Sequence, residues 1–195
     1  RDLHLSLRRQ RQMCIRDRLI GGYCNIMGNN VLLSTDDVQK RLEELGIATL
    51  TYDHPPLFTV EDSKALRGPI PGYHCKNLFL RGKKSQMWLI VCREDLAVDL
   101  KEIGARLGGQ RLSFGSAERL FKYLGVIPGA VSPFALINDF NQDIDVILDK
   151  GMMSLSPLNF HPITNEKTTS ISPGGLLKYI GSCGHQPKII DLEQT

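Results

Sequence analysis

The sequence predicts an α+β or mixed α/β fold, a single domain in which helices surround a mostly antiparallel sheet. Its 195 residues are 42% hydrophobic and 23% charged, which is typical of one globular domain with a substantial core. Two β-rich runs, residues 75–82 and 86–92, flank a short polar turn, and this arrangement is typical of an antiparallel hairpin. At least four segments space their apolar residues as a helix does, and strand-like runs lie between them.

Residues 34–47 predict the first helix, and both of its ends are marked. Ser34 or Thr35 can cap its start, and apolar residues recur at helical spacing from Val38 onward. Gly46 then ends the helix.

A strand, a corner and a second helix are predicted next. Residues 47–54 alternate as a short strand, and the prolines of residues 54–58 favour an extended corner. A capping box from Thr59 to Asp62 predicts a helix over residues 59–66.

Helices and strands continue to mix after the hairpin. The second hairpin run is apolar on both faces, which predicts a central, covered strand. We expect helices over residues 98–109, 116–125 and 172–181, and strands within residues 126–138, 143–153, 157–162 and 187–192. The last helix has Ser172 as its N-cap and Pro173 at its first position.

Charge divides the chain into two parts. Residues 1–30 hold six arginines and two aspartates, a net charge of +4, whereas residues 31–195 hold 18 basic and 19 acidic residues, a net charge of −1. We expect residues 1–30 to be a non-native leader that is disordered or loosely helical, and residues 31–195 to form the domain. Its near-neutral charge argues against non-specific binding of nucleic acid.

The cysteines and the missing motifs exclude several classes. The five cysteines are scattered and form no C-x-x-C pair, which argues against a disulfide framework and a zinc site and suits the cytoplasm. No apolar run approaches the ~18 residues of a membrane helix. Phosphate-loop and dinucleotide motifs are absent, so we expect no cofactor and no metal.

Lys76 is the first candidate site residue, because it begins a strand on the same face as Leu78 and Leu80. Either its stem packs while its ammonium reaches water, or the ammonium is held at a pocket rim and binds a phosphate or carboxylate. Asn77 points to the opposite face and could hydrogen-bond to the backbone.

A G-x-x-x-P turn and a histidine complete the candidates. Backbone N–H groups at Gly129 and Ala130 could hold a developing oxyanion, although the turn could equally be a plain loop that enters a strand. His161 is either a structural residue or part of a site, and we interpret His54 and His185 as structural. No Ser/His/Asp or Cys/His set can be assembled from the spacing.

Five segments together resemble the YbaK-like aminoacyl-tRNA deacylases, and most closely the prolyl-tRNA synthetase-associated (PrdX-type) subgroup, whose members hydrolyse Ala-tRNA(Pro). The segments are STDDVQKRLEELGI, HPPLFTVEDSKAL, GYHCKNLFLRGKK with MWLIV, RLSFGSAERLFKYLGVIPGAVSPFAL and FHPITNEKTTSIS. The resemblance covers the chain from residue 31 to residue 192. It implies one YbaK-like domain with a curved, mostly antiparallel sheet.

The resemblance also implies roles for individual residues. Lys76 matches a lysine that engages the 3′ end of the tRNA and is needed for hydrolysis, and Asn77 matches the asparagine beside it. The residues on the G-x-x-x-P loop, near the aminoacyl ester, are Gly129, Ser132 and Pro133. The residues that would line the amino-acid pocket are Phe58, Val60 and His161. Arg111 is a weaker match, as a contact to the terminal nucleotide.

The implied function is trans-editing, the hydrolysis of mischarged tRNA and most specifically of Ala-tRNA(Pro). An aminoacyl ester is already activated, so a positioned water and an oxyanion site at Gly129 and Ala130 suffice. The expected partners are the acceptor end of tRNA(Pro) and prolyl-tRNA synthetase. Three alternatives stay open: a deacylase for another species such as Cys-tRNA(Pro), a non-catalytic tRNA- or synthetase-binding module, and a small-molecule hydrolase, for which the sequence offers no nucleophile.

Overall fold

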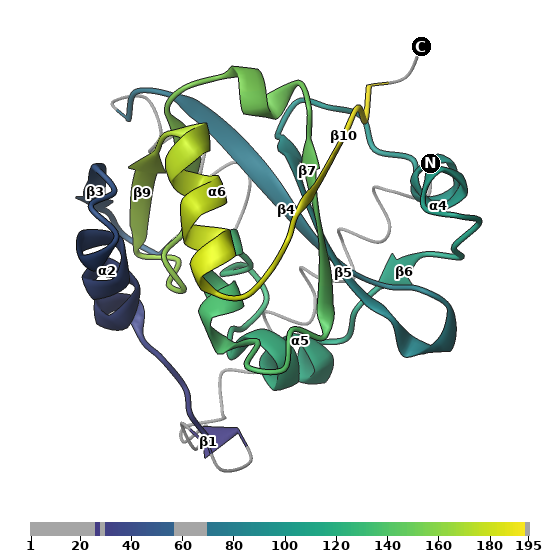
Figure 1. Cartoon of the computed structure of the whole chain (residues 1–195), viewed down its shortest axis with the longest axis horizontal. Coiled ribbons are helices and arrows are strands. Elements are labelled where there is room, and N and C mark those ends of the chain that lie inside the picture. Colours follow the sequence, from purple (N-terminus) through teal and green to yellow (C-terminus); the bar gives the residue numbers. More distant parts are fainter. Residues whose placement is uncertain (1–25, 28–29, 57–69, 194–195) are drawn as a thin grey trace.

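The computed structural model describes residues 26–27, 30–56 and 70–193, and within them the chain builds an eight-stranded mixed sheet with helices on both faces (Figure 1) and a separate two-stranded sheet. The strand order is β10–β7–β5–β4–β8–β9–β3, and β6 pairs with β4 off this path. The strands are β3 (Thr49–Asp53), β4 (Tyr73–Arg81), β5 (Met87–Arg93), β6 (Ser113–Phe114), β7 (Ile144–Asp149), β8 (Leu158–Phe160), β9 (Lys167–Ile171) and β10 (Lys188–Ile190). The predicted mixed α/β class is confirmed.

Strand directions are both parallel and antiparallel. The predicted hairpin is confirmed, because β4 and β5 pair antiparallel from Cys75–Arg93 to Arg81–Met87. Antiparallel pairs also join β9 to β8 and to β3, and β6 to β4. β7 is parallel to both β5 and β10, and β8 is parallel to β4.

Four α-helices are described, and they cover the two faces of the sheet unequally. They are α2 (Thr35–Glu44), α4 (Leu100–Arg106), α5 (Ala117–Leu124) and α6 (Pro173–Ser182), with 3-10 turns η1 (Lys83–Ser85), η2 (Pro133–Asn138) and η3 (Met152–Ser154). α2, α5, α6 and η2 bury their apolar sides in a large core on one face, whereas α4 packs in a smaller core on the other. None of the described helices is long and apolar enough to cross a membrane.

The helix ends follow the sequence signals. The Asp37 carboxylate accepts hydrogen bonds from the backbone N–H and the hydroxyl of Ser34 at the start of α2. These bonds lower the pKa of Asp37. The Ser172 hydroxyl accepts from the N–H of Gly175 at 3.0 Å at the start of α6. Each such cap stabilises a helix by about 1 kcal/mol.

The predicted strand within residues 126–138 is wrong. Its apolar part, Pro133–Asn138, forms η2 instead, and every residue in it is buried. A short run that is buried on all sides has no periodicity that separates a strand from a helical turn. Here Ser132 caps the turn and Pro133 supplies its first residue, so a helical turn forms.

One strand is not predicted from the sequence, and two expectations concern residues that are described only in part or not at all. β9 was not expected, because its residues are mostly polar. In the part of residues 1–30 that is described, Ile26–Met27 pairs antiparallel with Asn30–Val31. The expectation of a disordered or loosely helical leader stays a prediction. The predicted helix of residues 59–66 lies outside the described residues.

Candidate active site

The candidate site lies where two parallel strands separate. β4 and β8 form only two residue pairs, Tyr73 with Leu158 and His74 with Asn159. Beyond these pairs β4 continues beside β5, while β8 ends at Phe160 beside β9. The predicted site residues on β4 and after β8 follow directly after this point.

Lys76 points to the face of β4 that carries Leu78 and Leu80, as predicted. Its ammonium donates hydrogen bonds to the carbonyl oxygen of Glu94, at 3.2 Å, and to that of Leu96. These two carbonyls in the turn after β5 explain how an ammonium is held beside an apolar face. An ammonium has three donors, so the two bonds leave one donor for an oxygen of a ligand.

Asn77 points to the opposite face and contacts the G-x-x-x-P loop. Its side-chain nitrogen donates to the carbonyl oxygen of Val131 at 2.9 Å. Its side-chain oxygen Oδ1 is buried and has no hydrogen-bond partner among the described residues. A buried acceptor without a partner costs about 1–3 kcal/mol, so a ligand that brings an N–H donor would remove this cost.

The loop begins with a tight turn that changes one predicted role. The N–H of Ala130 donates to the carbonyl oxygen of Ile127 at 3.1 Å, and Gly129 has a φ of +97°. Pro128 followed by a glycine at positive φ is typical of a type II turn. The Ala130 N–H is therefore occupied and cannot also hold an oxyanion. The N–H of Gly129 is not part of this bond, and Gly129 is exposed.

Ser132 and Pro133 shape the loop, which corrects their prediction as substrate contacts. The Ser132 hydroxyl is fully buried and accepts from the N–H of Phe134 at 3.2 Å. Pro133 is the buried first residue of η2. Phe134 packs edge-on against Phe160, with ring centroids 6.1 Å apart, so η2 fixes the loop against β8.

His161 follows β8 and is half-buried. Its Nδ1 lies 2.8 Å from the carbonyl oxygen of Lys167, and its ring meets the edge of the His54 ring at a centroid distance of 5.9 Å. The sequence indicates only a structural role for His54. The signal that could have found it is its position directly after a strand, immediately before two prolines.

The predicted residues therefore approach the divergence from two faces of the sheet. Lys76 lies on the face of the smaller core, and the His54–His161 pair contacts Thr168, which faces away from the larger core. Asn77 and the turn of residues 127–130 lie on the face of the larger core, where Val131 packs.

Two predicted residues are not described, and a third lies away from this set. Phe58 and Val60 lie outside the described residues. Arg111 precedes β6, whose Ser113 pairs with Arg81 at the far end of β4. A strand rises about 3.3 Å per residue, so Lys76 and Arg81 are roughly 16 Å apart along β4.

No thiolate nucleophile is prepared among the described cysteines. Burial raises the pKa of Cys75 and of Cys92 to about 12, and burial also raises the pKa of Cys183. All three thiols are therefore protonated at neutral pH. No group of three or more His, Cys, Asp and Glu side chains in the described part of the chain could hold a metal ion.

Comparison with known families decides what this arrangement belongs to. The model of the aminoacyl-tRNA editing domain matches residues 54–179, a segment that holds β4, the G-x-x-x-P loop and both histidines. The chain belongs to the aminoacyl-tRNA editing domain family. This editing domain is an aminoacyl-tRNA deacylase, a hydrolase of the ester that joins an amino acid to tRNA.

Relatives of the editing domain cover most of its length. It is 37% identical over 153 residues to the prolyl-tRNA editing protein ProX of Acetoanaerobium sticklandii, which covers 78% of this chain and 93% of that protein. It is 33% identical over 163 residues to prolyl-tRNA synthetase associated domain-containing protein 1 of Danio rerio, over 80% of this chain and 89% of that protein.

Solved structures share the fold. A crystal structure described as a proposed trans-editing enzyme for prolyl tRNA synthetase matches with a TM-score of 0.64 at 22% identity, over 84% of this chain and 99% of that one. At this identity the match concerns the fold alone, and it agrees with the sheet described above.

Proposed function

We propose that this editing domain works in trans on tRNA that prolyl-tRNA synthetase has mischarged, with Ala-tRNA(Pro) as its main substrate, in the cytoplasm. The names of its relatives support this, since one is a prolyl-tRNA editing protein and another carries a prolyl-tRNA synthetase associated domain. The proposed partners are the acceptor end of tRNA(Pro) and prolyl-tRNA synthetase.

The observation that supports the proposal is the set of polar groups on β4 and on the loop that Asn77 contacts. A held ammonium at Lys76, a buried acceptor at Asn77 and the backbone of the exposed Gly129 suit the three polar parts of an aminoacyl-tRNA end. These parts are the phosphate or ribose, the α-amino group and the ester carbonyl.

The reaction needs water rather than a protein nucleophile. Water attacks the ester carbonyl, the C–O bond to the ribose breaks, and the released hydroxyl takes the proton. The third donor of Lys76 holds the terminal phosphate or ribose, which keeps the ester in place. The Gly129 N–H stabilises the tetrahedral oxyanion, and Ala130 supports it only by closing the turn. Protonated thiols at Cys75 and Cys92 agree with this route.

Selectivity for alanine has a physical reason. A pocket built for proline rejects a smaller amino acid poorly, because a missing methylene is worth only about 1–3 kcal/mol. A second site that admits alanine and is too small for proline corrects the error. We propose that His161, with Phe58 and Val60, sets the size of that site. Arg111 would then meet the nucleic acid further from its 3′ end.

The test is deacylation of Ala-tRNA(Pro), Pro-tRNA(Pro) and Cys-tRNA(Pro) by the full chain and by its Lys76→Ala variant. We expect fast loss of alanine alone, and a rate lowered at least about a hundredfold by the substitution. Lys40→Ala is the matched control, because Lys40 is an exposed lysine on α2.

Other results would favour the alternatives. Preferential loss of cysteine would make the protein a Cys-tRNA(Pro) deacylase. Binding of tRNA without hydrolysis of any ester would make it a binding module.

A further inference from the structure

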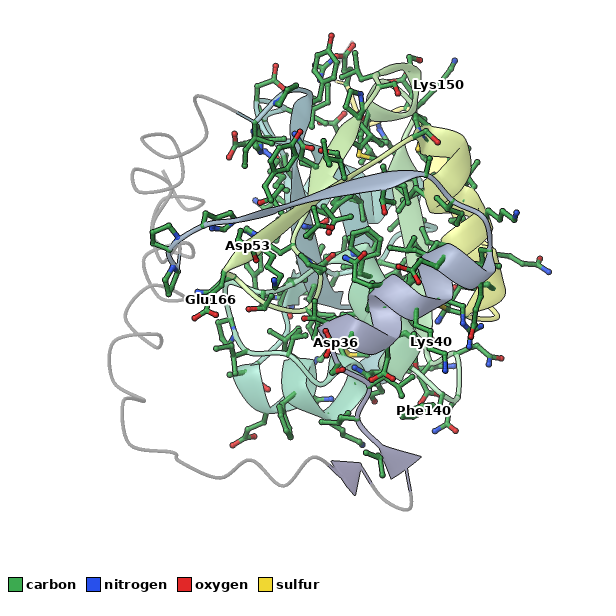
Figure 2. The ribbon with its side chains drawn as sticks, turned by 90° about the vertical axis from the view of Figure 1, so that its left-hand side faces the viewer. Asp36, Lys40, Asp53, Phe140, Lys150 and Glu166 are labelled. Carbon is green, nitrogen blue, oxygen red and sulfur yellow. The ribbon has the colours of Figure 1, made fainter. Side chains whose placement is uncertain are left out.

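Two histidine rings contact each other beside the candidate site. His54 directly follows β3 and His161 directly follows β8, and the two strands are neighbours of β9. The ring centroids are 5.9 Å apart with an interplanar angle of 63°, so the rings meet edge to face. Figure 2 shows this end of the sheet, where Asp53 and Glu166 are labelled at the end of β3 and before β9.

The His54 ring is held at both nitrogens. Its Nδ1 lies 2.9 Å from the carbonyl oxygen of Pro55, and its Nε2 lies 2.9 Å from the Thr168 hydroxyl. A carbonyl only accepts, so Nδ1 carries the proton, and in the neutral ring Nε2 accepts from the hydroxyl. Both nitrogens are thereby occupied, so the ring is suited to support a neighbour and not to transfer protons.

The first two residues of β9 hold both rings. Thr168 holds His54 through its hydroxyl, and Lys167 holds His161 through its carbonyl oxygen, 2.8 Å from Nδ1. β9 is itself fixed here, because the Lys167 ammonium forms an ion pair with the Asp53 carboxylate. Thr168 is only 4% exposed, so water does not compete effectively for its hydroxyl.

We propose that His54 is a positioning residue for His161, and that the Thr168 hydroxyl is the group that fixes His54. The inference rests on the proposed function, which puts His161 in the amino-acid pocket. A pocket discriminates by size only if its wall does not yield. A His161 ring that packs against a fixed His54 ring forms a more rigid wall than His161 alone would form after the end of β8.

The first test compares Thr168→Val with Thr168→Ser in the full chain. Valine keeps the shape of threonine and removes the hydroxyl, whereas serine keeps the hydroxyl. We measure kcat/KM for Ala-tRNA(Pro) and Pro-tRNA(Pro). Thr168→Val is expected to lower the alanine-over-proline ratio about tenfold while the value for alanine stays within about twofold, since a wall contact of this kind is worth roughly one methylene. Thr168→Ser is expected to keep the wild-type ratio.

A second readout does not depend on activity. In nitrogen-15 NMR of the histidine rings, both His54 and His161 are expected as the Nδ1–H tautomer in the wild type. Thr168→Val is expected to shift the ring signals of both residues and to leave those of the distant His185 unchanged.

The outcomes separate the two proposals. Signals of His161 that do not respond to Thr168→Val, or a ratio that does not change in a folded variant, overturn the positioning role. Equal loss of activity on both substrates also overturns it, because that is the result of a merely structural role. A wild type that hydrolyses no Ala-tRNA(Pro) defeats the proposed function instead, and the NMR comparison still decides whether the rings are coupled.

Discussion

Asn77 is bound at one end of its carboxamide and unpartnered at the other. The nitrogen holds the loop at Val131, while the oxygen is buried without a partner in the described part of the chain. The α-ammonium group of an aminoacyl ester is a strong donor that fits such an acceptor. A hydrogen bond to a charged group contributes about 1.5–3 kcal/mol.

This predicts how Asn77→Leu changes the recognition of the amino group. The measured quantity is the rate enhancement over the uncatalysed hydrolysis of each ester. In the wild type, this enhancement is expected to be at least about tenfold larger for the alanyl ester than for the propionyl ester, which lacks the amino group. Asn77→Leu should accelerate both equally. Asn77→Asp keeps an acceptor and should retain the preference. A preference that survives in the leucine variant contradicts the assignment.

Gly129 allows a prediction that separates the effect of backbone strain from the effect of steric crowding. A Cβ at Gly129 would meet no atom within 4 Å, yet its φ of +97° is one that residues with a side chain rarely adopt. Gly129→Ala should therefore lower the free energy of unfolding by about 1–2 kcal/mol and slow deacylation, because the turn must move. Gly174→Ala in α6 is the control, since space is also open there and φ is not positive. Urea unfolding that ranks the two variants equally would refute this account.

Among the elements, η2 connects stability with the site. Ser132→Ala removes the cap of η2 and should lower the free energy of unfolding by about 1 kcal/mol. It should also slow deacylation, because η2 fixes the turn that carries Gly129. Ser116→Ala removes the corresponding cap of α5, so it should cost similar stability and leave the rate unchanged. Equal rates for the two variants would mean that η2 does not control the site.

Some helices and strands could be predicted from the sequence and others could not. Helices α2, α5 and α6 were predictable because caps and apolar spacing agree at each of them. β9 was missed because its buried Thr169 and Ser170 look exposed in sequence. Cross-strand hydrogen bonds compensate their burial, from Thr169 to Thr51 at 2.9 Å and from Ser170 to Asn159 at 2.5 Å.

Part of the site was predictable from the alternation of side chains along a strand. Strand alternation alone gave the opposite faces of Lys76 and Asn77. It could not reveal that the Ala130 N–H closes a turn, since that depends on loop geometry. It also could not bring His54 to His161, because the pairing of β3 with β9 joins segments more than 100 residues apart.

At the scale of the whole molecule, a buried histidine and a buried aspartate bring two loops that are distant in sequence close together. His185, after α6, has its Nε2 3.5 Å from the Asp139 carboxylate, and both side chains are 3% exposed. The same carboxylate accepts from the N–H groups of Asp143 and Ile144, at the start of β7. Burial lowers the pKa of His185, although the carboxylate opposes this in part.

The pair predicts how stability depends on pH. An unfolded histidine binds a proton below about pH 6.5, whereas the folded His185 stays neutral to lower pH. Unfolding then takes up a proton. The stability that the neutral His185 contributes is therefore complete above that pH and is lost progressively as the pH falls below it. The free energy of unfolding should fall below that pH by at most about 1.4 kcal/mol per pH unit. Burial raises the pKa of Asp139, and its protonation opposes the fall at lower pH. His185→Gln should flatten the curve in urea titrations at pH 7, 6 and 5, and an unchanged slope would contradict the prediction.

The order of strands in the sheet has a consequence for the growing polypeptide. β10 pairs with the outer side of β7 and is made about 40 residues after it, which takes roughly 2–8 seconds at about 5–20 residues per second. During that interval the apolar strand IDVILD can present an open edge in a nascent chain that is otherwise able to collapse. A ribosome that stalls before residue 188 would leave this edge available to other nascent chains. β10 therefore closes an edge that the nascent chain leaves open until residue 188 is made.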